Sequence, residues 1–146
     1  MARWLGIDHG TRRIGLAIGD AEAGIASPLE QAPLAMGPLA KRVRELAEEY
    51  AAVGVVVGWP INADGSEGPQ GRLARRFAAK LAEATGLDIR LWDERLSSFE
   101  ADQRLKGIFT RKQKRRRHDA VAAAEFLKDF LASNGPDLAP RPAEAN

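Results

Sequence analysis

The chain has 146 residues, of which 45% are hydrophobic and 29% are charged, proportions typical of one globular domain with one core. It contains no cysteine, which excludes disulfide bonds and thiolate zinc sites and favours a cytoplasmic protein. No stretch approaches the roughly 18 consecutive apolar residues that a membrane helix needs, so no membrane partner is expected.

The formal net charge of +2 conceals an uneven distribution of charge. Residues 104–117 carry eight Lys or Arg and no acid, whereas the rest of the chain before residue 134 is net acidic. One basic segment in an otherwise acidic chain indicates a local anionic partner rather than a generally basic surface.

The N-terminal third predicts antiparallel strands. Residues 3–8 and 13–20 are short and mainly apolar, and the four residues between them suit a hairpin. A third, weaker strand is predicted over residues 25–31, where Pro28 interrupts the pattern.

The middle of the chain alternates between helical and extended patterns. Apolar residues at helical spacing predict a helix over residues 38–52, and the run of valines at 53–58 predicts a buried, parallel strand. After a loop at 59–68, a helix is predicted from Pro69 to Gly86, the first residue suiting a helix start and the second a helix end.

The C-terminal half begins with a predicted strand over residues 87–92. A capping box at 97–100 predicts the start of another helix, and residues 107–117 are expected to form a basic, mobile connection. The last helix is predicted from about Arg116 to Ser133.

Together these elements predict an α/β fold with a mixed five-stranded sheet and helices on both faces. The folded domain is expected to cover residues 1–133. The proline-rich tail, residues 134–146, is expected to be disordered.

Three acids are notable for their position: Asp8 and Glu94 follow predicted strands, and Asp119 lies in the first turn of the last helix. Mixed sheets place their ligands beyond the carboxyl ends of parallel strands. Acids that converge there repel one another unless a cation intervenes, and carboxylate oxygens suit Mg²⁺ or Mn²⁺. The three acids therefore indicate a metal site.

Each acid also has a simpler interpretation. Asp8 could accept hydrogen bonds from turn amides, Asp119 could interact with the helix dipole, and Glu94 could pair with Arg95. Asp93 is an alternative to Glu94, because adjacent strand residues point to opposite faces and only one of the two is expected at the site.

Two further segments suit phosphate. Gly10 and Thr11 form a turn whose amides a phosphate can approach, although this Asp-x-Gly-Thr pattern also fits the phosphate hairpin of sugar kinases and actin-like ATPases. Residues 111–117 have six bases in seven positions, which suits a nucleic-acid backbone; a solvated charged loop is the alternative. The basic candidates for nucleic-acid binding in this run are Lys112, Lys114, Arg115, Arg116 and Arg117.

Four blocks of sequence resemble the YqgF family, Holliday junction resolvase-like proteins also assigned to processing of small-subunit ribosomal RNA precursors. They are residues 6–17 (GIDHGTRRIGLA), 57–60 (VGWP) with 64–66 (DGS) and Phe77-Ala78, 93–98 (DERLSS), and 112–114 with 119–124 (DAVAAA). Trp59 stands where the family usually has Leu, Ser98 where it has Thr, and His118 where an aliphatic residue is common.

The resemblance implies a ribonuclease H-like fold with Asp8, Glu94 and Asp119 as the catalytic, metal-binding acids. It also places Arg13 and Arg95 in the shared pattern. The resulting hypothesis is phosphodiester hydrolysis assisted by one or two Mg²⁺ or Mn²⁺ ions. Arg13, Arg95 and the Gly10–Thr11 amides would hold the non-reacting phosphate oxygens.

Two other functions compete with a nuclease. The first is a nucleic-acid-binding module without cleavage, which the acids oppose because carboxylates repel phosphates unless a metal intervenes. The second is a relative of actin-like ATPases, which close two lobes around a nucleotide, whereas this chain is long enough for one. The choice between RNA and branched DNA is open, and a junction-cutting enzyme would need a dimer.

Overall fold

The computed structural model describes residues 2–9, 13–93 and 111–143, with the backbone alone for residues 111–119. One five-stranded sheet forms its centre, in the order β3-β2-β1-β4-β5. The strands are β1 (Arg3–His9), β2 (Arg13–Asp20), β3 (Ile25–Pro33), β4 (Ala52–Trp59) and β5 (Ile89–Asp93). β1, β2 and β3 pair antiparallel, whereas β1, β4 and β5 run parallel. The predicted mixed sheet is confirmed.

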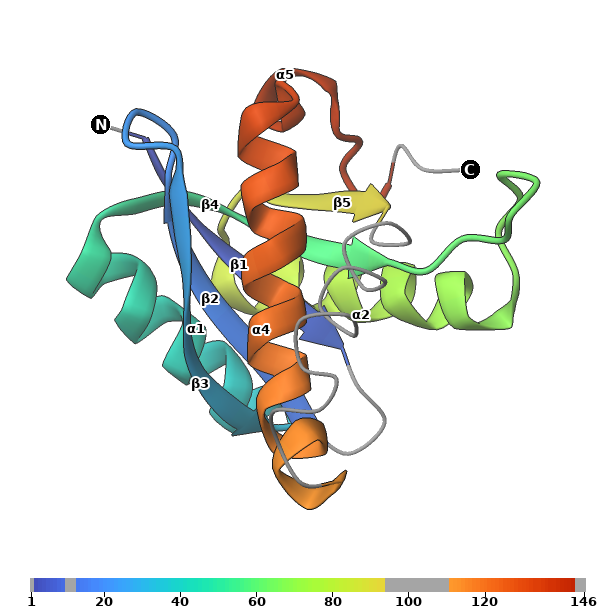
Figure 1. The fold of residues 1–146 in the computed structure, drawn as a ribbon, viewed down its shortest axis with the longest axis horizontal. Coiled ribbons are helices and arrows are strands. Elements are labelled where there is room, and N and C mark those ends of the chain that lie inside the picture. The colour runs from blue at the N-terminus through green and yellow to red at the C-terminus, as the bar shows by residue number, and fades with distance from the viewer. Residues whose placement is uncertain (1, 10–12, 94–110, 144–146) are drawn as a thin grey trace.

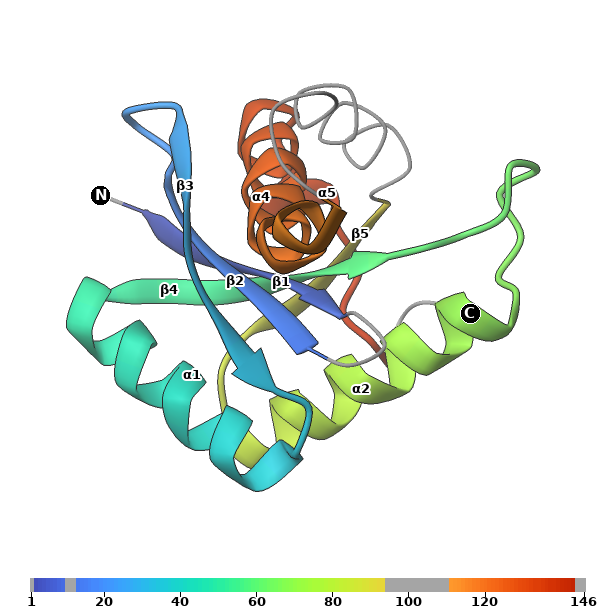
Figure 2. The same ribbon diagram turned by 60° about the horizontal axis from the view of Figure 1, so that its bottom comes forward.

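Helices cover both faces of this sheet (Figures 1 and 2). α1 (Met36–Tyr50) and α2 (Pro69–Thr85) lie on one face, and α4 (Arg111–Ala132) with the short α5 (Gly135–Leu138) lies on the other. No helix in the part of the chain that the structure describes is long and apolar enough to cross a membrane.

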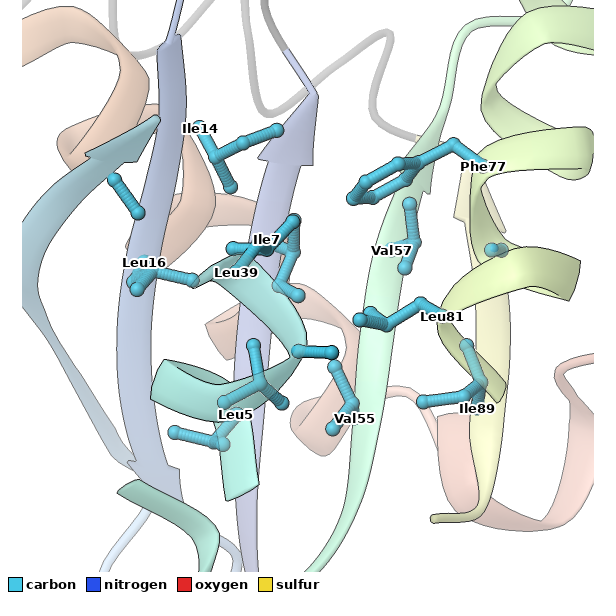
Figure 3. Packing of buried hydrophobic residues seen from close by; sticks show 14 of the residues in the cluster. Leu5, Ile7, Ile14, Leu16, Leu39, Val55, Val57, Phe77, Leu81 and Ile89 are labelled. Carbon is cyan, nitrogen blue, oxygen red and sulfur yellow. The ribbon is translucent and has the colours of Figure 1, made fainter. Parts of the chain in front are cut away.

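Strand alternation divides the core into two layers. Leu5 and Ile7 of β1 point toward α1 and α2, where they join Val55, Val57 and Leu81 in the larger cluster (Figure 3). The residues of β1 that alternate with these two point toward α4. One of them, Trp4, packs edge-on against Phe130 with ring centroids 5.0 Å apart. Each position on β1 is thereby assigned to one of two faces.

Helix α4 lies very close to the sheet because glycines face it. A Cβ atom added at Gly6 would lie 3.1 Å from Leu127 Cβ and 3.2 Å from the Ala123 carbonyl oxygen. One added at Gly19 would lie 2.7 Å from Leu131 Cδ1. Any larger residue at these two positions would push the helix away from the sheet.

The predicted helix boundaries hold for α2 and shift for α1 and α4. α2 begins at Pro69 and ends where Gly86 adopts φ 73°. α1 covers residues 36–50 instead of 38–52, because Ala51 turns into the left-handed conformation at φ 54° and ends the helix. The helix expected from residue 97 lies outside the described residues.

The prediction of a mobile connection over residues 107–117 is wrong for its described part, since residues 111–117 belong to α4. Lys, Arg and Gln are good helix formers, and residues 111–133 contain no Gly or Pro to break the helix. Their charge, not their helix propensity, suggested a loop.

The C-terminal tail was expected to be disordered, but its residues 134–143 are ordered against β5. Arg90 Nη1 donates to the carbonyl oxygens of Pro136 (2.7 Å) and Ala139 (3.1 Å), and the Leu91 amide donates to Pro140 (2.9 Å). Asp88 links the two segments because both Arg90 and Arg141 pair with it. The partners that order the tail lie more than 40 residues earlier in sequence. The composition of the tail alone therefore gave the wrong prediction of disorder.

Substituting Gly6→Ala should lower the free energy of unfolding by about 1–3 kcal/mol, because the new methyl group meets the backbone of α4, which cannot rotate away. Urea unfolding followed by circular dichroism measures the change. Gly37→Ala is the matched control: it lies in α1 with no atom within 4 Å of the added Cβ, so it should be neutral or slightly stabilising. Equal stability of the two variants would contradict the close packing of α4.

Candidate active site

Asp8 occupies the last-but-one position of the central strand β1. Asp8 is 9% exposed. Among the residues that the structure describes, it is the only charged one that is buried. Trp4 and Gly6, four and two positions earlier, contact α4, so alternation directs Asp8 to the same face. Gly15 of β2 lies directly opposite Asp8 and contributes no side chain.

The carboxyl ends of the three parallel strands meet at one edge of the sheet. Ile7 of β1 pairs with Val57 of β4, and Trp59 of β4 pairs with Asp93 of β5. Such an edge is where sheets of this kind bind ligands. Asp8 thus lies at the position that the sequence analysis predicted for a site.

His9, the neighbour of Asp8, points to the opposite face. Its ring stacks on Phe77 of α2 with centroids 4.3 Å apart and an interplanar angle of 10°. Burial lowers the pKa of His9 below its ordinary value, so the imidazole is neutral at pH 7. His9 anchors the end of β1 to α2 and does not share the face of Asp8.

Asp93 also lies away from the face of Asp8. In β5, Ile89 and Leu91 belong to the cluster under α1 and α2. Trp92 packs toward α4, where its ring contacts Phe130 and its indole nitrogen donates to Asp129 (2.9 Å). Alternation returns Asp93 to the face of α1 and α2, beside Trp59. Of the two adjacent acids, Asp93 is therefore the one that the sheet directs away from Asp8.

The structure describes only part of the predicted acidic site. Gly10, Thr11, Glu94 and Arg95 lie outside the described residues. Asp119 lies in α4, as do all five basic candidates of the 111–117 run, but the side chains of residues 111–119 are not described. Within the described side chains, no group of three His, Asp or Glu is arranged to hold a metal ion.

Arg13, a further basic candidate for phosphate binding, is described in full. It is the exposed first residue of β2, and its Nη1 atom donates to Gln31 Oε1 of β3 at 3.0 Å. Sequence reasoning missed Gln31, because a single glutamine in an edge strand carries no pattern.

The pairing of Leu16 with Glu30 and of Ala17 with Pro28 leaves an irregularity at Leu29, which accommodates Pro28 in the strand.

Comparison with known proteins identifies the family. The family model described as "RuvX: Holliday junction resolvase" matches residues 2–133. The chain belongs to the RuvX family. The predicted resemblance to Holliday junction resolvase-like proteins is thereby confirmed, and the chain is a nuclease.

Relatives of this RuvX-family chain match along nearly its whole length. A protein of Anaeromyxobacter dehalogenans (strain 2CP-1 / ATCC BAA-258) named "Putative pre-16S rRNA nuclease" is 43% identical over 143 residues, covering 92% of this chain and 99% of the relative. A protein of the same name from Geobacillus kaustophilus (strain HTA426) is 40% identical over 135 residues, covering 90% and 98%.

The fold agrees with that of solved structures. RuvC from T. thermophilus in complex with a Holliday junction substrate superposes with a TM-score of 0.58 at 17% identity, covering 96% of this chain and 99% of that one. At this identity the likeness concerns the fold alone. It confirms the ribonuclease H-like architecture expected of the family.

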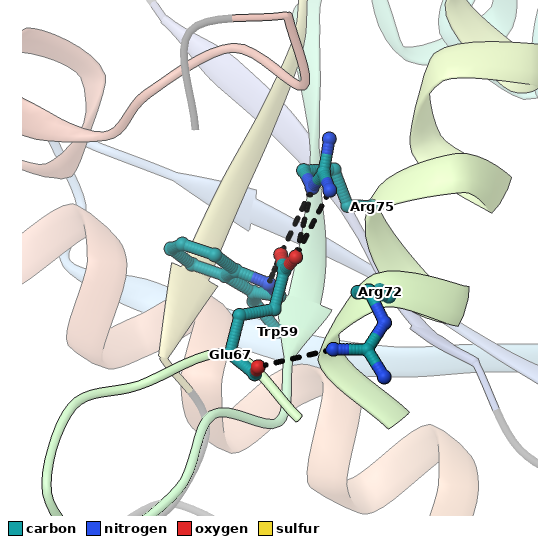
Figure 4. Close-up of polar contacts among 4 residues, drawn as sticks. All are labelled: Trp59, Glu67, Arg72 and Arg75. Atoms are coloured by element: carbon teal, nitrogen blue, oxygen red, sulfur yellow. Dashed lines mark hydrogen bonds and ion pairs between the residues drawn. The ribbon is translucent and has the colours of Figure 1, made fainter. Parts of the chain in front are cut away.

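The loop after β4 is anchored by a residue that sequence reasoning also missed, Glu67 (Figure 4). Its carboxylate accepts from Arg75 Nε (2.9 Å) and Nη2 (3.0 Å) and from the indole nitrogen of Trp59 (3.1 Å). A leucine at position 59, the residue expected there from the resemblance, could not donate this bond. Trp59 and Arg75 together hold Glu67, and with it the loop, at the carboxyl edge of the sheet.

The Glu67 anchor predicts a pH-dependent stability. Hydrogen bonds from Arg75 lower the pKa of Glu67 below its ordinary value of 4.5, against the opposing effect of burial. The ion pair thus stabilises the fold above about pH 4.5 and is lost as pH falls through the lowered pKa. Glu67→Gln should cost roughly 1–2 kcal/mol at pH 7, and the difference from wild type should vanish in acid.

Urea unfolding between pH 7 and pH 3 measures this dependence. Glu83→Gln, an exposed position on the same helix as Arg75, is the matched control and should follow wild type at every pH. A deficit in Glu67→Gln that stayed constant down to pH 3 would rule out the ion pair as its cause.

Proposed function

We propose that this nuclease is Mg²⁺- or Mn²⁺-dependent, that Asp8, Glu94 and Asp119 hold the metal, and that its substrate is a precursor of small-subunit ribosomal RNA. The observation that carries the proposal is the buried Asp8 carboxylate at the carboxyl edge of the central strand. A buried carboxylate is costly unless it is hydrogen-bonded, paired or bound to a cation. Its hard oxygen donors fit Mg²⁺ or Mn²⁺.

The packing of α4 supports Asp119 as a partner of Asp8. Going along the sheet, Gly19 lies against Leu127 and Leu131, and Gly6 lies against Ala123 and Leu127. Gly19 is paired with Trp4, so Gly6 lies two strand residues farther along, about 6.6 Å. Over this distance the contact moves about four residues toward the start of α4, which is about 6 Å of helix rise. The next step, from Gly6 to Asp8, reaches the turn of α4 that contains Asp119.

Strand alternation supports Glu94 rather than Asp93. Asp93 belongs to the face of α1 and α2, opposite to the face of Asp8. If the chain stays extended for one more residue, Glu94 points to the α4 face. The three acids of the proposed site would then come from β1, the end of β5 and α4.

A bound divalent cation would supply a Lewis acid that lowers the pKa of water and stabilises the charge on the leaving oxygen. The chain's own groups would hold and orient the substrate. The carboxylates of Asp8, Glu94 and Asp119 fix the metal's place. Arg13, Arg95 and the Gly10–Thr11 amides would hold oxygens of the substrate's phosphate backbone near it.

The start of α4 supports a long anionic partner. Six bases lie in residues 111–117, and the first turn of α4 contains no acid. Cations at the N-terminus of a helix are unfavourable, because the helix dipole is positive there. A nucleic-acid backbone would relieve this repulsion and bind without reading sequence.

The relatives favour RNA as the substrate. Proteins named for a nuclease of pre-16S ribosomal RNA match at 40% and 43% identity over 90% or more of this chain. The description of the family model favours branched DNA as a second candidate. Cleavage of a four-way junction at two strands would need two copies of the site, hence a dimer. Either substrate is consistent with a cytoplasmic enzyme.

A cleavage panel tests the function. With Mg²⁺ or Mn²⁺, wild type should cleave precursor ribosomal RNA faster than four-way junction DNA or plain single strands, and a chelator should abolish cleavage. Asp8→Asn should lower kcat about a thousandfold or more, because a metal ligand contributes several kcal/mol to the transition state. The melting temperature of Asp8→Asn should equal that of wild type, which would show that the variant folds.

Asp137→Asn is the matched control for this loss of charge. Asp137 is exposed on α5 at the far end of the α4 face, so the variant should cleave at the wild-type rate. Normal cleavage by Asp8→Asn would refute the acidic site, and preferential cleavage of junction DNA would favour the second substrate.

The adjacent acids provide a separate test. Glu94→Gln should reduce kcat about as strongly as Asp8→Asn, whereas Asp93→Asn should keep kcat within a fewfold of wild type. Both substitutions remove one negative charge, so a general electrostatic effect would affect them alike. The reverse ranking would assign Asp93 to the metal and show that the chain does not stay extended after β5.

A further inference from the structure

A surface pocket of about 400 Å³ opens where β2 begins and β3 ends. Arg13, Gln31, Ala32 and Pro33 are the described residues that line it. It combines one exposed guanidinium group with one side-chain amide, and these two groups are hydrogen-bonded to each other. The pocket therefore presents nitrogen donors at the rim of the sheet.

The hydrogen bond fixes which way the Gln31 amide points. Arg13 Nη1 donates to Gln31 Oε1 at 3.0 Å, and a guanidinium group can only donate. The amide oxygen must therefore face Arg13, and the NH₂ group must face away from it. The orientation follows from the chemistry of arginine and does not rest on telling nitrogen from oxygen by shape.

The NH₂ group of Gln31 is buried and has no hydrogen-bond acceptor among the side chains and backbone that the structure describes. A buried donor without a partner costs roughly 1–3 kcal/mol. In native structures such groups are rare, and a ligand is one of the ways in which they are satisfied. The missing partner must be an acceptor, because both hydrogens of the amide are donors.

Gln31 also lies in line with Asp8. Gln31 of β3 pairs with Gly15 of β2, and Gly15 pairs with Asp8 of β1. Paired residues of neighbouring strands point to the same face, so Gln31 and Asp8 both point to the α4 face. Two strand spacings separate them, about 10 Å, and Gly15 places no side chain between them.

We propose that Gln31 and Arg13 form a subsite for a nucleic-acid phosphate adjacent to the one cleaved at Asp8. The Gln31 NH₂ group and the remaining N–H groups of Arg13 donate to its non-bridging oxygens. A phosphate supplies both the acceptor that Gln31 lacks and the negative charge that Arg13 attracts. This inference rests on the proposed function, since Asp8 must mark the cleaved bond.

Steady-state cleavage by Gln31→Glu and Gln31→Leu tests the subsite. Glutamate keeps the shape but repels phosphate, so KM should rise about tenfold or more. Leucine only removes the donors, so KM should rise a fewfold. kcat should stay within a fewfold of wild type, because the contact is made equally in the ground state and the transition state. Gln70→Glu, the same change at an exposed position of α2, should leave KM unchanged.

A methylphosphonate scan of the substrate identifies the contacted group. One neutral linkage near the cleaved bond should raise the KM of wild type by a larger factor than that of Gln31→Leu, in which only Arg13 still contacts this phosphate. A KM equal to that of Gln70→Glu in both Gln31 variants would overturn the subsite. So would a Gln31 effect that varied with base sequence and not with the neutral linkage, which would mean base readout.

Failure of the proposed function gives a different result. If wild type cleaves nothing, the Gln31 side-chain NH₂ signal in a ¹H–¹⁵N spectrum, assigned by its absence in Gln31→Leu, is followed as a short oligonucleotide is added. A shift of this signal without a shift at Gln70 supports the subsite without any catalysis. Equal or absent shifts overturn it.

Discussion

The close contact between α4 and the sheet is the constraint on which the site depends. Gly6 and Gly19 leave no Cβ atoms between the strands and the helix, so the helix backbone sits directly on β1 and β2. The contact fixes how far α4 is displaced along the strands. Because Asp8 is two residues beyond Gly6 and Asp119 is one turn before Ala123, the same contact sets the level at which the two acids can meet. A looser interface would leave the acids at an undefined separation.

At the carboxyl edge of the sheet, the candidate functional side chains and the structural side chains lie on opposite faces. His9 and Asp93 point to the face of α1 and α2, where His9 stacks on Phe77 and Asp93 lies beside Trp59. Asp8 and Gln31 point to the face of α4. Residues that are adjacent in sequence therefore serve opposite faces. Glu67 also has a structural role, because its carboxylate accepts hydrogen bonds from Trp59 and Arg75 on the α2 side and so anchors its loop.

Local signals in the sequence predicted the fold well. Proline at 69 and glycine at 86 bound α2 as expected, and the burial of Asp8 agrees with its predicted place at a strand end. Contacts between distant residues could not be predicted in this way. The role of Gln31 depends on its hydrogen bond with Arg13, and that of Glu67 on its bond with Arg75. The position of the tail depends on Arg90. The start of α4 was missed for another reason: clustered positive charge was interpreted as a loop although the residues favour a helix.

The C-terminal segment has a consequence for how this sheet ends. β5 is an edge strand, and an exposed edge offers unpaired amides to any other strand. Here the Leu91 amide already donates to Pro140, and prolines at 136, 140 and 142 give the covering segment few amides of its own to offer outward. On the other side, Pro28 interrupts the donors of β3. Both borders of the sheet thus resist extension by a further strand, so copies of this chain that associate would meet through helices or loops and not by continuing the sheet.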